Sequence, residues 1–164
     1  MSDTRVISRR PTHLLLQEHE LLGSLIEAFQ DLAPSQVQEK TVLFRRIEEE
    51  IGIHVGTEEA LFYPTLLELK DPEIHSRVRE ALADHRALET LVADLRRVQS
   101  QSTFDLLMKA LQARAVRHLE FEERKIFPFA SKLPRVAQSQ LGLDIEERQM
   151  HEEGGPDEQE NHPA

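Results

Sequence analysis

The sequence predicts an all-α protein that folds as an up-down-up-down four-helix bundle. Apolar residues recur with helical spacing in four long segments, and prolines or short polar stretches separate these segments. Glycine is rare, with 6 residues in 164, and no stretch alternates apolar and polar residues long enough to indicate a sheet. Because the connections are short, neighbouring helices are expected to run antiparallel.

The four helices follow one another with clear breaks. They are expected over about 11–32, 36–69, 72–100 and 102–134. Pro11 suits a first helical turn, while Pro34 and Pro72 lie in the breaks that follow the first and second helices. Pro64 and Pro128 lie inside helical patterns, and each is expected to kink its helix or end it early.

Residues 1–136 are therefore expected to form one domain, and residues 137–164 to add a short helix and a tail. The short helix is expected over 137–143. From Asp144 to Ala164 there are eight acidic residues against Arg148 alone, so this end carries −7 of the net charge of −10. Such a polar, charged segment is expected to be a disordered acidic tail.

Composition excludes several classes of protein. The chain has no cysteine, which excludes disulfides, thiolate metal sites and cysteine nucleophiles. Its acidic balance disfavours nucleic acid as a partner. No apolar run approaches the roughly 20 residues of a membrane span, and the first residues do not resemble a signal peptide. A cytoplasmic protein is expected, and its oligomeric state stays open.

The two halves of the chain repeat each other. The stretch from His54 to Pro64 and the stretch from His118 to Pro128 both read His-x-x-x-Glu-Glu-x-x-apolar-aromatic-Pro, offset by 64 residues. The stretches 18–26 and 84–92 both read acid-His-x-x-Leu-x-x-Leu-aliphatic, offset by 66 residues. The bundle is therefore expected to be two helix hairpins related by an approximate two-fold axis.

Metal-binding residue types lie on the apolar faces of all four predicted helices. Residues four apart share one face of a helix, so the two side chains of each His-x-x-x-Glu pair point the same way. They align with apolar residues and are expected to face the interior. The six inward residues are His19, His54, Glu58, His85, His118 and Glu122.

Burying these six residues calls for compensation. A buried carboxylate without a partner is costly, and one or two divalent cations would balance two carboxylates among four imidazoles. Nitrogen and oxygen donors suit iron, manganese or zinc. Buried His–Glu hydrogen bonds are the alternative, which the two-fold repetition of the six residues makes less favoured.

The order H…H-x-x-x-E…H…H-x-x-x-E, with an aromatic residue and proline after each pair, resembles the hemerythrin-like (HHE cation-binding) domains over about residues 12–133. The resemblance implies a non-haem centre of two iron ions joined by an oxo or hydroxo bridge. The six residues match the family's metal ligands, with Glu58 and Glu122 as bridging carboxylates.

The chain departs from the oxygen-carrying hemerythrins at Glu89. Those proteins have a histidine four residues after the one that matches His85, and here that position is Glu89. Glu89 is expected on the inner stripe, as a metal ligand, as an acceptor for an imidazole N–H, or as a side chain that reaches solvent. Loss of the fifth histidine argues against simple reversible oxygen carriage.

Neighbouring residues have plainer interpretations. Glu59 and Glu123 are expected to point off the inner face, as solvated side chains or as outer partners of the site. Glu18 and Asp84 receive a similar interpretation. Tyr63 is expected to pack in the core or to line an entry path.

The first functional hypothesis is a protein that binds or reacts with O2, peroxide or NO at a carboxylate-bridged di-iron site. The alternative is an iron- or oxygen-responsive sensor or binding module without turnover, and metal storage is less favoured. A dedicated enzyme has weak support, because no Ser-His-Asp arrangement or phosphate loop is visible, so no catalytic residue is assigned.

Overall fold

The structure, a computed structural model, describes residues 10–153, and every regular element within them is a helix. The long helices are α2 (Pro11–Gln30), α3 (Val37–Thr57), α5 (Pro72–Arg97), α6 (Gln101–Lys125) and α8 (Arg135–Glu153). The short elements are the π-helix η1 (Glu58–Phe62), α4 (Tyr63–Leu67) and α7 (Phe127–Ala130). The prediction of an all-α protein is confirmed.

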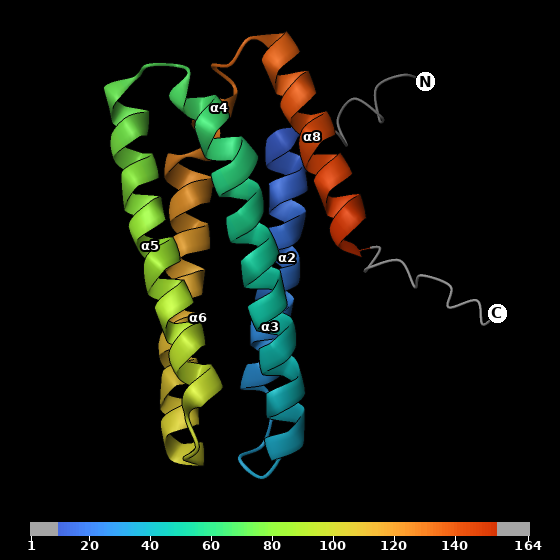
Figure 1. Ribbon diagram of the computed structural model, residues 1–164, viewed down its shortest axis with the longest axis vertical. Helices are drawn as coiled ribbons and strands as arrows, with labels where there is room; N and C mark the ends of the chain where they lie inside the picture. The colour runs from blue at the N-terminus through green and yellow to red at the C-terminus, as the bar shows by residue number, and fades with distance from the viewer. Residues whose placement is uncertain (1–9, 154–164) are drawn as a thin grey trace, which may run out of the picture.

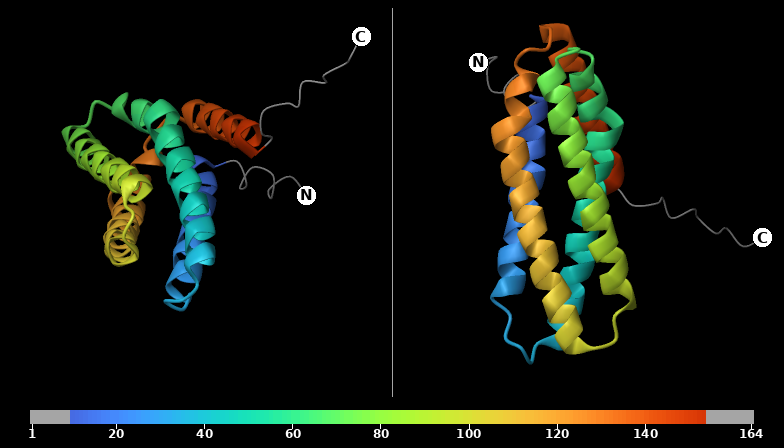
Figure 2. Two further views of the ribbon diagram at one scale, coloured as in Figure 1. Left: turned by 60° about the horizontal axis from the view of Figure 1, so that its bottom comes forward. Right: turned by 90° about the vertical axis from the view of Figure 1, so that its left-hand side faces the viewer.

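The long helices are arranged as two hairpins side by side. Helix α2 packs against α3, and α5 packs against α6. Figure 1 shows these four helices lying along the long axis of the molecule, each running back beside the one before it. The second view in Figure 2 shows the tight turns that join α2 to α3 and α5 to α6 at the same end. Within residues 10–153, no helix is long and apolar enough to cross a membrane.

Local capping explains where the second hairpin begins and turns. The side chain of Asp71 accepts a hydrogen bond of 2.8 Å from the backbone N–H of Glu73, with Pro72 in the first turn of α5. The hydroxyl of Ser100 accepts from the N–H of Thr103 at the start of α6. These caps satisfy N–H groups that have no partner inside the helix.

The apolar core is divided into two clusters. One cluster contains Leu15, Leu66 and Ile126 and lies toward the end of the bundle that carries α4 and α7. The other contains Ile47 and Leu111 and lies toward the tight turns. Along α2, α5 and α6 the predicted histidines stand at the boundary between the two clusters. A layer of buried polar side chains thus separates two apolar regions.

The expected short helix over 137–143 is wrong in length, because α8 continues to Glu153. Leu141 and Ile145 are buried, at 3% and 0% exposure, in the first core cluster, and α8 packs against α2, α3 and η1 (Figure 1). Acidic residues expected in a disordered tail therefore lie in this helix. The remainder of the predicted tail, 154–164, lies outside the described residues.

Replacing Ile145 by alanine is expected to lower the free energy of unfolding by roughly 2–5 kcal/mol, because it opens a cavity at a fully buried site. Chemical denaturation followed by circular dichroism measures this change. Leu143→Ala is the matched control: Leu143 is 41% exposed, and its replacement is expected to cost less than about 0.5 kcal/mol. Equal, small effects of both substitutions would show that α8 does not contribute to the stable core.

Pro64 and Pro128 both interrupt their helices, as the sequence predicts. Before Pro64 the α-helix widens into η1, and the N–H of Tyr63 bonds to the carbonyl of Glu58, five residues back. Before Pro128 the helix breaks at Ile126, whose φ is −111°, and restarts as α7. Proline lacks an N–H and clashes with the carbonyl four residues earlier, so regular α-helix cannot pass either point undisturbed.

Candidate metal centre

The structure brings the six predicted residues together in one buried layer, called here the polar layer. Glu58, His85, His118 and Glu122 have 0% exposure, and His54 and His19 have 2% and 4%. One ligand atom from each of His54, Glu58, His85, His118 and Glu122 lies within 4.8 Å of all the others. His19 joins them through its Nε2 atom, 3.4 Å from Oε2 of Glu122.

The histidines point their Nε2 atoms into the layer. Nε2 of His118 lies 3.0 Å from Nε2 of His85 and 3.4 Å from Nε2 of His54. Oε2 of Glu122 lies 3.3 Å from Nε2 of His118 and 3.4 Å from Nε2 of His54. Oε2 of Glu58 lies 3.3 Å from Nε2 of His85 and 3.4 Å from that of His54. Each carboxylate thus reaches histidines of both hairpins.

The outer Nδ1 atom of each histidine faces a carboxylate from another helix. The distances are 2.9 Å from His19 to Glu123, 2.9 Å from His85 to Glu59, 3.5 Å from His54 to Glu18, and 3.8 Å from His118 to Asp84. These pairs follow the internal repeat, because Glu59 corresponds to Glu123 and Glu18 to Asp84. The repeat therefore includes the surroundings of the histidines as well as the histidines themselves.

These outer carboxylates determine which nitrogen of each ring carries hydrogen. A carboxylate at Nδ1 favours the N–H there, so the inward Nε2 atom keeps its lone pair. Two such lone pairs face each other at 3.0 Å between His85 and His118. This arrangement is repulsive unless a cation lies between the rings.

The outer carboxylates are themselves held in place. Arg86 reaches Glu59 at 3.0 Å, Arg114 reaches Asp84 at 2.6 Å, and Gln149 of α8 donates to Glu18 at 2.7 Å. Of the two interpretations of these acids, the structure places all four as outer partners. The acid that adjoins each motif residue in both repeats was the available sequence signal. It could not show that each acid serves a histidine of a different helix.

Tyr63 is a member of the site that the sequence analysis placed in the core. Its ring is buried, with 2% exposure, but its hydroxyl points into the polar layer. The hydroxyl donates a hydrogen bond of 2.8 Å to Oε2 of Glu58 and also contacts Oε1 of Glu122. It lies 3.4 Å from Nε2 of His85. Tyr63 therefore contacts both central carboxylates.

Glu89 does not join the site, and its expected place on the inner stripe is wrong. Its side chain is 48% exposed and pairs with Arg86 at 3.0 Å. From His85 the buried stripe of α5 continues three residues on, to Leu88, which has 1% exposure. A step of four residues leads off this stripe, so Glu89 reaches solvent, the third of the three outcomes considered.

Burial and mutual charge distribute protons unevenly in the layer. Burial lowers the pKa of His118 to about 4. Burial and the charge of Glu122 raise the pKa of Glu58 well above its usual value. Burial also acts to lower the pKa of His54, but the carboxylates of Glu58, Glu122 and Glu18 outweigh it and raise this pKa well above its usual value. A metal ion would displace these protons, so cation binding competes with protonation.

The donor set fits a transition metal. Nε2 of His19, Oε1 of Glu58 and Oε2 of Glu122 are buried without a hydrogen-bond partner, which is costly unless something else satisfies them. Imidazole nitrogen together with carboxylate oxygen suits iron, manganese and zinc. The six residues therefore satisfy both requirements of a metal site, donor chemistry and burial.

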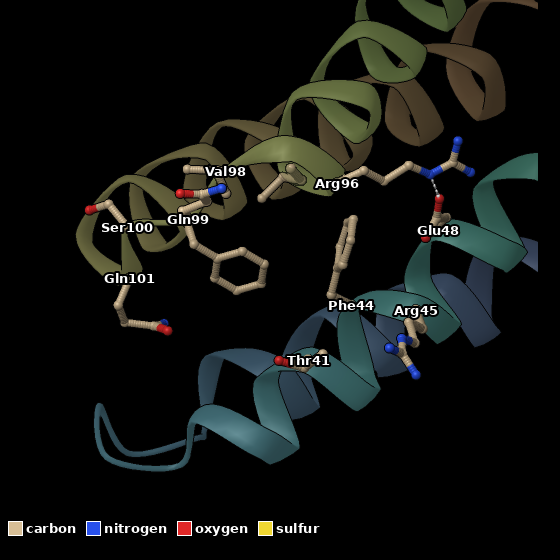
Figure 3. Close-up of a pocket in the computed structure, with 11 residues that line it drawn as sticks. Thr41, Phe44, Arg45, Glu48, Arg96, Val98, Gln99, Ser100 and Gln101 are labelled. Atoms are coloured by element: carbon tan, nitrogen blue, oxygen red, sulfur yellow. Dashed lines mark hydrogen bonds and ion pairs between the residues drawn. The ribbon is translucent and has the colours of Figure 1, made fainter.

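A cavity of about 370 Å³ lies elsewhere, near the tight turns. Figure 3 shows it between α3 and the segment that joins α5 to α6, with Phe44 on one wall and Arg96 reaching across to Glu48. None of the six residues of the polar layer lines it. Ligand chemistry is thus expected at the buried layer and not in this cavity.

Comparison with known proteins agrees with the geometry. The family model of the hemerythrin HHE cation binding domain matches residues 10–130. The crystal structure of a hemerythrin HHE cation binding domain-containing protein from Mycobacterium kansasii has a similar fold. It superimposes with a TM-score of 0.72 at 22% sequence identity, covering 86% of this chain and 85% of that one. No curated protein matches the chain.

Proposed function

Because this chain belongs to the hemerythrin HHE cation-binding domain family, we propose that its polar layer holds two metal ions, which are iron in the native protein. We further propose that it binds or reacts with O2, peroxide or NO there. The family and the buried His/Glu cluster support metal binding. The number of ions, their identity and the small ligand belong to the proposal.

The observation that carries the proposal is the inward orientation of the imidazoles. His85 and His118 turn unprotonated Nε2 atoms toward each other at 3.0 Å, while their Nδ1 atoms face Glu59 and Asp84. Polar-core hydrogen bonding alone would place a proton between the two nitrogens. A shared cation accounts for the whole arrangement, including the buried oxygens that lack a partner.

In the proposed centre each hairpin contributes two histidines and one carboxylate. His19 and His54 come from the first hairpin, and His85 and His118 from the second. Glu122 lies beside histidines of both hairpins, as does Glu58, which suits two carboxylates that each bridge two ions. The outer carboxylates hold the rings in orientation and increase the basicity of the nitrogens.

The surrounding core would control what reaches this centre. When bound, iron would supply a redox-active ion able to take a small molecule as an additional ligand. Phe62, Leu15 and Leu66, each with 0% exposure, close the layer on the side of the first core cluster. Such packing excludes bulk water and admits only small, weakly polar molecules, which is why O2, NO and peroxide are proposed.

Metal content and reactivity test the proposal directly. The chain is loaded with Fe(II) without oxygen, desalted and assayed by elemental analysis, and its visible spectrum is followed as air, peroxide or NO is added. We expect about two irons per chain, as one ion for each pair of histidines, and spectral changes with at least one of the three molecules. Failure to retain iron would refute the proposed centre. Two irons without any spectral response would leave a metal site but refute the proposed reactivity.

A further inference from the structure

The polar layer follows the internal repeat in its six His and Glu residues but not in Tyr63. The position that corresponds to Tyr63, 64 residues on, is Phe127. The ring of Tyr63 stacks on His85, with centroids 5.6 Å apart, and the ring of Phe127 lies against His19 at 5.2 Å. Since His85 and His19 correspond in the repeat, the two aromatic residues hold equivalent places. Only one of them carries an oxygen.

A local distortion of the helix brings that oxygen into the layer. Five residues of regular α-helix rotate by about 500°, which would leave positions 58 and 63 about 140° apart. In η1 the N–H of Tyr63 bonds to the carbonyl of Glu58, five residues back. Five residues then make roughly one full turn, so Glu58 and Tyr63 point the same way.

The position of the hydroxyl fits that of a metal ligand. Atoms bound to one ion at about 2.0–2.2 Å lie roughly 2.8–3.5 Å from one another. The hydroxyl oxygen of Tyr63 lies 2.8 Å from Oε2 of Glu58 and 3.4 Å from Nε2 of His85. The same oxygen contacts Glu122, and the surrounding core excludes water from it. A hydrogen bond to one carboxylate would not require this convergence on three ligand-type side chains.

We propose that Tyr63 is a seventh protein ligand, whose phenolic oxygen binds the ion held on the His85 side and makes the metal centre asymmetric. The proposal rests on the metal centre proposed above. Binding forms a bond between Oη and the ion and breaks the phenolic O–H bond, with the proton leaving to solvent. The His19 side keeps the same histidine and carboxylate pattern but has the apolar ring of Phe127 in place of the phenol.

The chain offers an unambiguous spectroscopic test, because Tyr63 is its only tyrosine. The protein is loaded with Fe(II) without oxygen, oxidised with ferricyanide, and assayed for iron before any spectrum is recorded. We expect an intense visible band from charge transfer between phenolate and ferric iron. Resonance Raman excitation in this band should show phenolate ring modes that shift when the protein is grown on ring-deuterated tyrosine.

Tyr63→Phe keeps the ring and removes the oxygen, so it is expected to retain iron while the visible band and the Raman modes are lost completely. Phe62→Leu is the control, because Phe62 is equally buried in η1 but has no polar atom, and it should keep both signals. If Tyr63→Phe fails to fold, the isotope shift in the unchanged protein still decides the question.

The two proposals fail in distinguishable ways. Iron-loaded protein without phenolate modes would overturn ligation by Tyr63 and leave the metal centre intact. Retention of the visible band and its Raman modes in Tyr63→Phe would also overturn it. Protein that takes up no iron would overturn the metal centre, and ligation by Tyr63 with it.

Discussion

Replacing Glu122 by alanine is expected to abolish stoichiometric metal binding. Glu122 is fully buried and lies within 3.4 Å of Nε2 of His19, His54 and His118, so no other side chain contacts more of the histidines. Loss of even an outer partner of a metal ligand typically costs about 10–100-fold in affinity. We therefore expect a loss of more than about 100-fold, measured by metal titration of the metal-free chain.

The fold should survive this substitution, because alanine removes a buried charge without leaving an unpaired one in its place. Glu120→Ala is the matched control, two residues earlier on α6, where the side chain is 55% exposed and its nearest cation is Arg124 at 3.9 Å. This variant is expected to bind metal like the unchanged protein. Full metal occupancy in Glu122→Ala would show that the polar layer is not the metal site.

Removing the metal is expected to lower the melting temperature by on the order of 10 °C. A ligand at about 1,000 times its dissociation constant stabilises the folded state by about 4 kcal/mol, and a domain of this size shifts by roughly 2–4 °C per kcal/mol. The physical reason is that metal loss leaves Glu58 and Glu122 facing each other in the core at 0% exposure. Thermal melts before and after chelation and desalting measure the shift.

Glu122→Ala provides the internal control for this experiment. If the shift arises from the polar layer, the melting temperature of the variant should not respond to the chelator. An equal response of both proteins would assign the effect to chelator or to metal bound elsewhere. An unchanged melting temperature in metal-depleted native chain would show that the layer is stable as a polar core.

The sequence predicted the six residues of the polar layer because their signals are local. A spacing of four residues places His54 with Glu58, and His118 with Glu122, whatever the remainder of the fold does. The repeat of this spacing then indicated two matching hairpins. The same reasoning was wrong for Glu89, since a residue four positions along meets the same face only while the buried stripe keeps that step. In α5 the stripe continues at Leu88 instead.

The length of α8 was mispredicted for a related reason. The average composition after Asp144 is strongly acidic, and it concealed the buried pair Leu141 and Ile145, which are four residues apart. Whether such a short apolar stripe orders a helix depends on a surface that can receive it. That surface, formed by α2, α3 and η1, exists only in the folded protein.

The sequence by itself determined the helical class, the positions of the two proline interruptions and the identity of the six inward residues. Helical periodicity and proline chemistry act within a few residues of chain, so they can be read without the fold. Only the tertiary structure decided which carboxylate faces which histidine, as between Glu18 and His54, and that the hydroxyl of Tyr63 reaches the polar layer. These contacts join different helices or depend on a widened turn, and the packing of one helix against another determines them.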